Sequence, residues 1–187
     1  ITFESELHRT GELGKTPCKA FPIKAYYELH IEQGPVLEAE NTTIGVVTGG
    51  QGLYWKHITL CGQDSHAGTT PMAYRKDALM GASRIITGLR EIIHKHSGSV
   101  CTVGRLETMP ASINTVPGEV FFTVDIRHPD DATLEGIHDQ LLGLVDSVCR
   151  QEGLSVNFDN TWKTPAVNFH EDCIAKVQRA AKDLGFS

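Results

Sequence analysis

The sequence predicts an α+β domain in which two helices cover one face of a four-stranded antiparallel sheet. Apolar residues recur with helical spacing over 78–93 and again over 134–149. Segments rich in β-branched and aromatic residues precede, separate and follow these two stretches. The resulting order from residue 53 to about residue 160 is β-α-β-β-α-β, which predicts a ferredoxin-like arrangement.

The first strand and the first helix follow each other in the amino-terminal half of this domain. Residues 53–60 have the β-branched and aromatic composition of a strand. The apolar face over 78–93 predicts the helix. We place its start at Thr70 and Pro71, which suit the N-cap and the first helical position, and its end at Gly98.

The next two strands are predicted at 100–106 and 119–127. The second of these alternates cleanly, so that one face covers a core and the other meets solvent or a ligand. The core face consists of Val120, Phe122, Val124 and Ile126, and the open face of Phe121, Thr123, Asp125 and Arg127.

The second helix and the last strand complete the domain. Acidic residues at 130–131 suit the positive end of a helix dipole, and Gly153 ends the helix. Alternation over 154–158 predicts the last strand. We therefore expect a compact domain at 52–162.

The flanking segments at 1–51 and 163–187 look like pieces of a second domain. Residues 1–24 read as irregular, whereas 25–31 and 44–48 suit strands. Asn168 and Glu171 have the spacing of a capping box, and they precede a helix with one apolar face that ends at Gly185. The compact domain would then be an insertion in the larger one.

Composition excludes several classes of protein. The chain has 187 residues, of which 40% are hydrophobic and 21% charged, and a formal charge of −6. The charge argues against nucleic acid and anionic membranes as partners, and no apolar run reaches the ~20 residues of a membrane span. Five well-separated cysteines predict buried free thiols in a reducing compartment, so we expect a cytoplasmic protein. The start resembles no signal peptide and lacks Met, which suggests a fragment.

The segment 28–35, Glu-Leu-His-Ile-Glu-Gln-Gly-Pro, is the first candidate for chemistry. His30 ends an apolar stretch, and Glu28 and Glu32 lie two residues to either side of it. A histidine there suits a metal ligand whose imidazole the two carboxylates orient. The alternative is a packed histidine on a solvated edge.

Three further residues lie in or beside predicted turns. His66 lies in Gly62-Gln-Asp-Ser-His-Ala-Gly-Thr-Thr-Pro71, where an imidazole can project outward, unless the turn serves geometry alone. Asn114 precedes Pro117 and Gly118 and suits either a ligand contact or a simple turn. Arg127 can grip a carboxylate with two hydrogen bonds, or form a surface ion pair with a neighbouring acid.

Other motifs are missing from the sequence. It has no phosphate-binding glycine loop, no G-x-S-x-G elbow and no H-E-x-x-H pair. His94 and His96 are two apart on a helix and cannot easily share a metal.

Together these segments resemble one family, the amidohydrolases that cleave N-carbamoyl groups. It includes ureidopropionase (β-alanine synthase), N-carbamoyl-L-amino-acid hydrolase and allantoate amidohydrolase, within the di-metal aminoacylase and carboxypeptidase superfamily. The resemblance extends from residue 25 to the end of the chain. The motifs that carry it are 28–35, Gly62 to Met72, Arg75-Lys-Asp-Ala-Leu79, Asn114 with Pro117-Gly-Glu119, and Asp125-Ile-Arg-His-Pro129. Residues 165–170 lean toward the ureidopropionase branch.

The resemblance implies a role for each matching residue. His30 would bind one of two divalent metals, zinc or manganese, and Gln33 would contact the substrate. His66 would enter the active site of a neighbouring subunit and stabilise the oxyanion. Asn114 would also bind the substrate, and Arg127 would hold its carboxylate. Residues 52–162 would be the lid and dimerisation domain of a homodimer, and 1–51 and 163–187 remnants of the catalytic domain.

The family's remaining metal ligands and its general base have no counterpart here. We therefore expect a fragment that binds no metal and is inactive alone, from an enzyme that hydrolyses a small N-carbamoyl amino acid to the amino acid, carbon dioxide and ammonia. Two alternatives stay open. One is a non-catalytic dimerisation or binding module, and the other is an aminoacylase or peptidase of the same superfamily.

Overall fold

The computed structural model describes residues 1–17 and 19–186. Contacts along the chain group residues 46–180 into one compact unit, which contains the predicted 52–162 domain. The remaining residues at the two ends of the chain form a second unit. The two units are described separately below.

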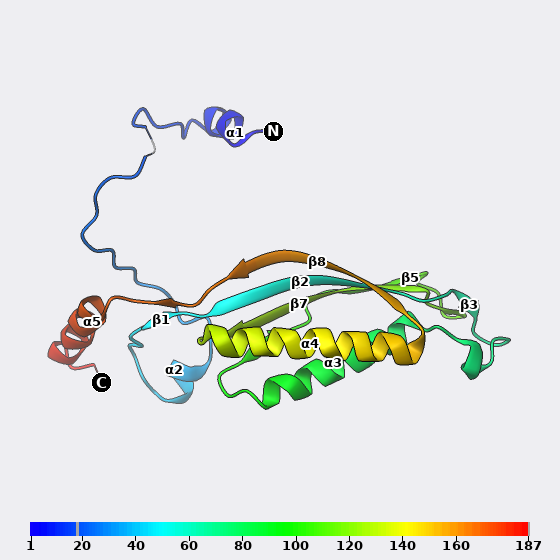
Figure 1. Ribbon diagram of the computed structural model, residues 1–187. Helices are drawn as coiled ribbons and strands as arrows, with labels where there is room; N and C mark the ends of the chain where they lie inside the picture. Colours follow the sequence, from blue (N-terminus) through cyan, green and yellow to red (C-terminus); the bar gives the residue numbers. More distant parts are fainter. Residues whose placement is uncertain (18, 187) are drawn as a thin grey trace. The chain divides into compact units, whose positions relative to one another are not determined.

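The larger unit is built on a five-stranded antiparallel sheet (Figure 1). Its path runs β4-β7-β2-β8, and β5 also pairs with β7. The bounds are β2 Gly52–Cys61, β4 Val100–Thr102, β5 Leu106–Met109, β7 Glu119–His128 and β8 Ser155–Thr164. The two helices, α3 Ala78–His94 and α4 Asp131–Glu152, lie together on one face. This order confirms the predicted ferredoxin-like β-α-β-β-α-β fold.

The core lies between the two helices and the inward face of the sheet. Alternation decides which strand residues enter it: in β7 every second residue from Val120 to His128 is buried, and the intervening ones are half-buried. The fully buried side chains at its centre are Phe122, Ile58, Leu60, Ile85, Leu89, Ile126, Ile137, Leu141, Val120, Val124 and Val145. The helical faces predicted from apolar spacing are the faces that pack here.

The strand predicted at 100–106 is two strands. Val100 pairs with Arg127 in β4, whereas Leu106 pairs with Phe122 in β5, so the register shifts by one residue between them. The extra residue of 103–105 forms a bulge that bends the edge of the sheet. Gly104 lies within it, where an interrupted strand pattern is a bulge signal.

Helix α3 begins later than predicted. Its N-cap is Asp77, whose carboxylate accepts hydrogen bonds from the backbone N–H groups of Leu79 and Met80 at 3.0 Å. The prediction of Thr70 and Pro71 as the start is wrong: Pro71 precedes only a short 3-10 helix, η1 Met72–Tyr74, after which Lys76 pairs with Gln63 in an isolated β-bridge, so α3 begins beyond it. The start and end of α4 agree with prediction: Asp130 caps it, and Gly153 ends it at φ +65°.

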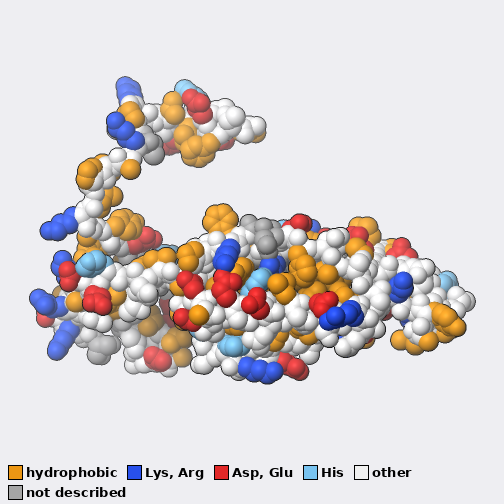
Figure 2. Space-filling model, in the orientation of Figure 1, with side chains coloured by type: hydrophobic (Ala, Val, Ile, Leu, Met, Phe, Trp, Pro, Cys, Tyr) orange, Lys and Arg blue, Asp and Glu red, His pale blue; other side chains and the backbone are white. Residues whose placement is uncertain are grey.

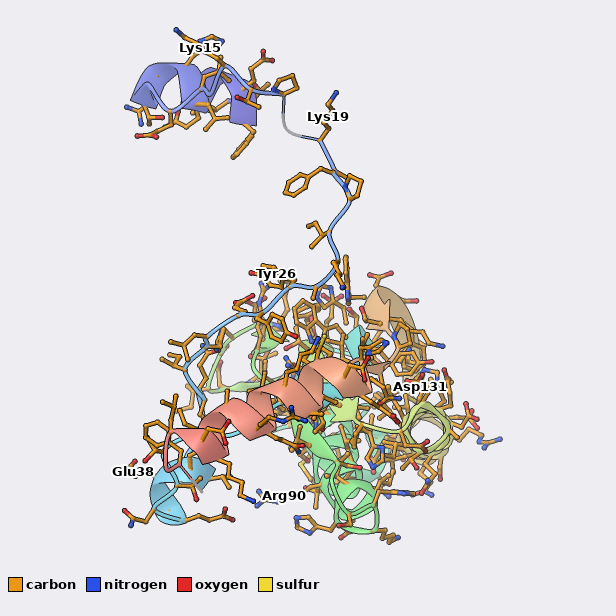
Figure 3. The ribbon with its side chains drawn as sticks, turned by 90° about the vertical axis from the view of Figure 1, so that its left-hand side faces the viewer. Lys15, Lys19, Tyr26, Glu38, Arg90 and Asp131 are labelled. Carbon is orange, nitrogen blue, oxygen red and sulfur yellow. The ribbon has the colours of Figure 1, made fainter. Side chains whose placement is uncertain are left out.

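The chain enters and leaves the larger unit side by side. Strand β1 (Gly49–Gly50) pairs with β9 (Val167–Asn168), and the Asp131 carboxylate accepts the Ala166 N–H at 2.8 Å at the same end (Figure 3). The strand predicted at 44–48 is wrong: the ladder with β9 is formed by Gly49 and Gly50, and Thr48 adds a single hydrogen bond, in which its carbonyl accepts the N–H of Phe169 at 2.9 Å. Helix α5 spans Glu171–Asp183, and its second N–H bonds the ring of His170, so the predicted Asn168–Glu171 capping box does not form.

The smaller unit holds two short helices joined by extended chain (Figure 3). Helix α1 (Phe3–Thr10) forms where 1–24 read as irregular, because Thr2 and Ser5 make a reciprocal capping box. Helix α2 spans Val36–Ala39. The strand predicted at 25–31 is wrong: a strand needs a neighbour for its N–H and C=O groups, and no ladder reaches this segment within the described residues.

Cys61, Cys101, Cys149 and Cys173 are free thiols, and Cys18 lies outside the described residues. Of these four, Cys149 is buried as predicted, whereas the other three are only half-buried. Within residues 1–17 and 19–186, no helix combines the length and apolar composition needed to cross a bilayer.

Candidate functional site

His66 and Asn114 come together at one end of the larger unit, here called the tip. They belong to a small ladder in which β3 (Ser65–His66) pairs with β6 (Thr115–Val116). His66 is paired with Thr115, and the N–H of Ala67 donates to the carbonyl of Asn114 at 2.9 Å. Two residues 48 apart in the sequence (114 − 66) are thus held on adjacent backbones.

The ring of His66 has a defined hydrogen-bonding state. Its Nδ1 accepts the backbone N–H of Gly68 at 3.0 Å. A ring nitrogen that accepts carries no proton, so the neutral imidazole holds its proton on Nε2. The side chain is exposed. His66 therefore presents an N–H donor to a ligand at the tip.

The amide of Asn114 is also turned to donate. Its Oδ1 accepts the hydroxyl of Ser112 at 2.7 Å, and its Nδ2 makes no hydrogen bond within the described residues. The residue is exposed. An amide nitrogen so placed can donate to the oxygen of a ligand.

Hydrogen bonds to backbone groups hold the tip against the neighbouring segments. The N–H of Gly62 donates to the carbonyl of Gly118 at 2.7 Å, and that of Gln63 to the carbonyl of Lys76 at 3.0 Å. The Asp64 carboxylate accepts the N–H of Gly118 at 2.7 Å. Sequence reasoning missed this role of Asp64, for which a short polar residue before a turn was the available signal.

Arg127 lies on the open face of β7, as the alternation predicted. Its guanidinium grips Asp125, with Nε 3.0 Å from Oδ1 and a terminal nitrogen 2.7 Å from Oδ2. This hydrogen bond raises the pKa of the arginine. The surface ion pair considered for Arg127 is thus present, and a ligand carboxylate would share the guanidinium with Asp125.

Arg127 lies far from the tip. From Glu119, which follows the tip loop, to Arg127 the strand advances about 26 Å at ~3.3 Å per residue. The structure therefore brings His66 and Asn114 together but separates both from Arg127. A single copy of the domain cannot place all three around one small molecule.

His30 and Gln33 lie in the smaller unit. The Nδ1 of His30 is 2.5 Å from the carbonyl of Ile31, an arrangement in which Nδ1–H donates and Nε2 keeps a free lone pair. Within the described residues no group of three or more His, Cys, Asp or Glu side chains could hold a metal. Glu32 does not orient His30. Its two oxygens accept the N–H groups of Val36 and Leu37 and cap α2.

A polar cluster on the core face of the sheet was not foreseen. Lys56 is only 3% exposed, and burial lowers its pKa. Beside it, the Tyr54 hydroxyl and Lys163 both bond the Glu135 carboxylate. His138 stacks on Tyr54 with ring centroids 4.5 Å apart, and burial followed by repulsion from Lys56 lowers its pKa. Tyr54 and Lys56 are buried, whereas the Lys163–Glu135 pair is about half exposed at the edge of the cluster.

Comparison with known proteins identifies the larger unit. A family model described as "Peptidase dimerisation domain" matches residues 48–152, more than half of the chain. The chain belongs to this dimerisation-domain family. The match begins just before β1 and ends at the last residue of α4, so it covers both helices and the tip.

The chain is similar to several curated amidohydrolases. An N-carbamoyl-L-amino-acid amidohydrolase from Rhizobium meliloti is 40% identical over 187 residues, covering 100% of this chain and 45% of the relative. An allantoate amidohydrolase from Bacillus subtilis is 34% identical, with 100% and 46% covered. The chain therefore spans a little under half the length of these relatives.

Solved structures agree in fold. A hydantoinase/carbamoylase family amidase from Burkholderia ambifaria matches with a TM-score of 0.92 and 41% identity, covering 100% of this chain and 46% of that one. A second amidase of that family, from Burkholderia multivorans, matches with a TM-score of 0.89 and 45% identity, covering 97% and 44%. The dimerisation domain here therefore has the fold found in these amidases.

Proposed function

We propose that this chain is part of a metal-dependent amidohydrolase that cleaves the ureido C–N bond of an N-carbamoyl amino acid. The observation that carries the proposal is the disposition of donors in the dimerisation domain. His66 and Asn114 present N–H groups at the tip, and Arg127 presents a cation at the other end of the sheet. The named relatives, which include carbamoyl-amino-acid and allantoate amidohydrolases, support the same reaction class.

The three residues fit three parts of such a substrate. Water adds to the ureido carbon, the bond to the amino acid nitrogen breaks, and the released carbamic acid separates into carbon dioxide and ammonia. The Nε2–H of His66 donates to the oxygen that gains negative charge, which is worth about 10²–10³ in kcat for a well-placed donor. Asn114 donates to a ureido or carboxylate oxygen, and Arg127 holds the carboxylate.

His30 and Gln33 would contribute to the metal and substrate sites. The exposed His30 with Nε2 free has the tautomer of a zinc or manganese ligand, but one imidazole alone does not make a site. Two such metals, when bound, supply an activated water. Gln33 would contact the substrate from the same segment, where its backbone turns at φ +54°.

Two copies of the domain would solve the separation of the tip from Arg127. In a pair related by a two-fold axis with antiparallel sheets, the tip of one copy lies near the Arg127 end of the other. The exposed edges of β8 and of β4 with β5 offer backbone groups for such pairing. The active unit is therefore a homodimer whose sites each combine His66 of one subunit with Arg127 of the partner subunit.

Mixing two inactive variants of the full-length enzyme tests this arrangement. Subunits carrying His66→Ala and subunits carrying Arg127→Ala are each expected to lose activity as homodimers. After dissociation and random reassociation, half the dimers are mixed and each has one intact site, so about a quarter of wild-type activity returns. No recovery in verified mixed dimers would contradict shared sites. Wild-type protein that releases no ammonia from any ureido substrate would contradict the reaction.

A panel of substrates separates the finer alternatives. N-carbamoyl-L-amino acids, N-carbamoyl-β-alanine and allantoate share the ureido group and the carboxylate. One carbon separates these groups in N-carbamoyl-L-amino acids and in allantoate, which has a second ureido group, and two carbons separate them in N-carbamoyl-β-alanine. N-acyl amino acids and dipeptides lack the ureido nitrogen. We expect the highest kcat/KM on an N-carbamoyl amino acid. Higher kcat/KM on N-acyl amino acids or dipeptides would favour the aminoacylase or peptidase alternative.

A further inference from the structure

We propose that Arg75 is a positioning residue for His66, acting through one peptide plane. The side chain of Arg75 is half-buried beneath the tip turn that runs from His66 to Thr70. Its Nε donates to the carbonyl of Thr70 at 3.0 Å, and a terminal nitrogen donates to the carbonyl of Ala67 at 2.7 Å. Both bonds are charge-assisted and therefore strong.

The contact to Ala67 decides the orientation of His66. The C=O of Ala67 and the N–H of Gly68 belong to the same peptide unit, which is planar and trans, so they point in opposite directions. Arg75 holds the oxygen end of this unit, and the nitrogen end donates to Nδ1 of His66 at 3.0 Å. Fixing one end of a rigid plane fixes the other.

The remaining contacts of the turn leave this task to Arg75. The N–H of Thr70 donates to the carbonyl of His66 at 3.2 Å, and the N–H of Ala67 donates to the carbonyl of Asn114 at 2.9 Å. Neither bond involves the peptide unit between Ala67 and Gly68, so neither sets its rotation. Arg75 forms no ion pair within the described residues, although its fork geometry suits a carboxylate. The guanidinium is thus committed to two backbone carbonyls of the turn that carries His66.

The chemical consequence is a fixed tautomer. With Gly68 N–H on Nδ1, the neutral ring keeps its proton on Nε2 and directs it outward. If the peptide rotates, Nδ1 loses this donor and both tautomers become populated. Apolar side chains of Met72 and Tyr74 are 72% and 78% exposed just beyond the turn, and Figure 2 shows exposed apolar surface at this end of the domain. Within the turn, His66, Gly68 and Thr69 are also exposed, so burial contributes little to holding it.

Nuclear magnetic resonance of the 187-residue chain tests the positioning directly. Long-range ¹H–¹⁵N correlations report the tautomer of His66 at a pH where the ring is neutral, and the Gly68 amide proton reports its hydrogen bond. We expect the Nε2–H form in the wild type, and in Arg75→Met a mixture of tautomers with a weakened Gly68 hydrogen bond. Arg75→Lys, which has no fork, should fall between them. Arg150→Met, an exposed arginine on α4, is the matched control. An unchanged His66 tautomer in a folded Arg75→Met chain overturns the proposal.

A kinetic arm asks whether the positioning matters for the reaction, and this arm rests on the proposed function. In the full-length enzyme, Arg75→Met should lower kcat about tenfold to a hundredfold with KM nearly unchanged, since it acts through a group that binds the transition state. In a His66→Ala background the same change should lower kcat less than about twofold. Full additivity of the two changes contradicts action through His66. An inactive wild type refutes the proposed function instead, and the tautomer measurement still decides the role of Arg75.

Discussion

Replacing Gly62 by alanine should damage the tip even though the backbone of this glycine is not left-handed. A Cβ at position 62 would lie 2.1 Å from the carbonyl oxygen of Lys76 and 2.8 Å from Cδ2 of Leu154. The first of these atoms is backbone and cannot swing aside as a side chain does. The chain must separate here by more than about 1 Å to reach an ordinary contact distance.

The cost can be worked from the bonds that this separation breaks. The N–H of Gly62 donates to the carbonyl of Gly118, and the N–H of Gln63 donates to the carbonyl of Lys76. Two backbone hydrogen bonds at about 1 kcal/mol each, plus about 1–3 kcal/mol for the overpacking, give ~3–5 kcal/mol. Alanine also restricts the unfolded chain more than glycine does, which stabilises the folded state by about 0.4–1 kcal/mol. The net loss is therefore about 2–4.6 kcal/mol, or roughly 4–18 °C in Tm at about 2–4 °C per kcal/mol for a chain of this size.

Urea and thermal unfolding of the Gly62→Ala variant measure this loss, and Gly143→Ala is the control. At Gly143, within α4, a Cβ meets nothing within 4 Å, so alanine should stabilise the helix by about 0.5–1 kcal/mol. The two identical substitutions thus have opposite expected signs. A Gly62→Ala chain as stable as the wild type, or a Gly143→Ala chain that loses as much as Gly62→Ala, would refute the steric argument.

Three further outcomes follow from the structure. Ile137→Ala should lower the free energy of unfolding by about 2–5 kcal/mol in urea without changing m, whereas the half-exposed Met80→Ala should change it by less than about 0.5 kcal/mol. The pKa of His138 is lowered in the folded state, so its contribution to stability is complete above about pH 6.5 and is lost as the pH falls through the folded pKa. The His138→Phe variant keeps the stack on Tyr54, and its free energy of unfolding in urea should therefore depend less on pH between pH 8 and pH 5. The 187-residue chain alone, given zinc or manganese and an N-carbamoyl amino acid, should release no ammonia, and turnover would contradict this expectation. Light scattering at tens of micromolar should give the mass of a dimer, and the mass of a monomer would count against dimerisation.

Periodicity was enough to predict the parts of the fold that bury a core. The alternation through 120–127 and the apolar faces of α3 and α4 predicted both the layers and the side of β7 that Arg127 occupies. These signals work because burial repeats with the period of the secondary structure. The same signals failed for 25–31, where an apolar pattern has no partner strand within the described residues, and for the bulge at 103–105, which depends on local register.

The candidate site could be predicted less completely, because its geometry depends on contacts between distant loops. The sequence picked out His66 and Asn114 as turn residues, but their adjacency comes from the pairing of β3 with β6. The link from Arg75 through one peptide plane to His66 has no periodic signature. Asp125 is two residues from Arg127 and its ion pair was foreseen, since both alternate onto one face.

Under the proposed function, the separation of the tip from Arg127 makes strand register important for activity as well as for stability. Over ten residues β2 and β7 pair without a break, from Gly52 with His128 to Cys61 with Glu119. A slip of one residue would turn Arg127 toward the core and Ile126 toward solvent, because side chains alternate with a period of two. Such a slip would bury a guanidinium and expose the centre of the core at once. The same burial that stabilises the sheet therefore holds Arg127 on the open face at a fixed distance from His66, as the proposed site shared between two subunits requires.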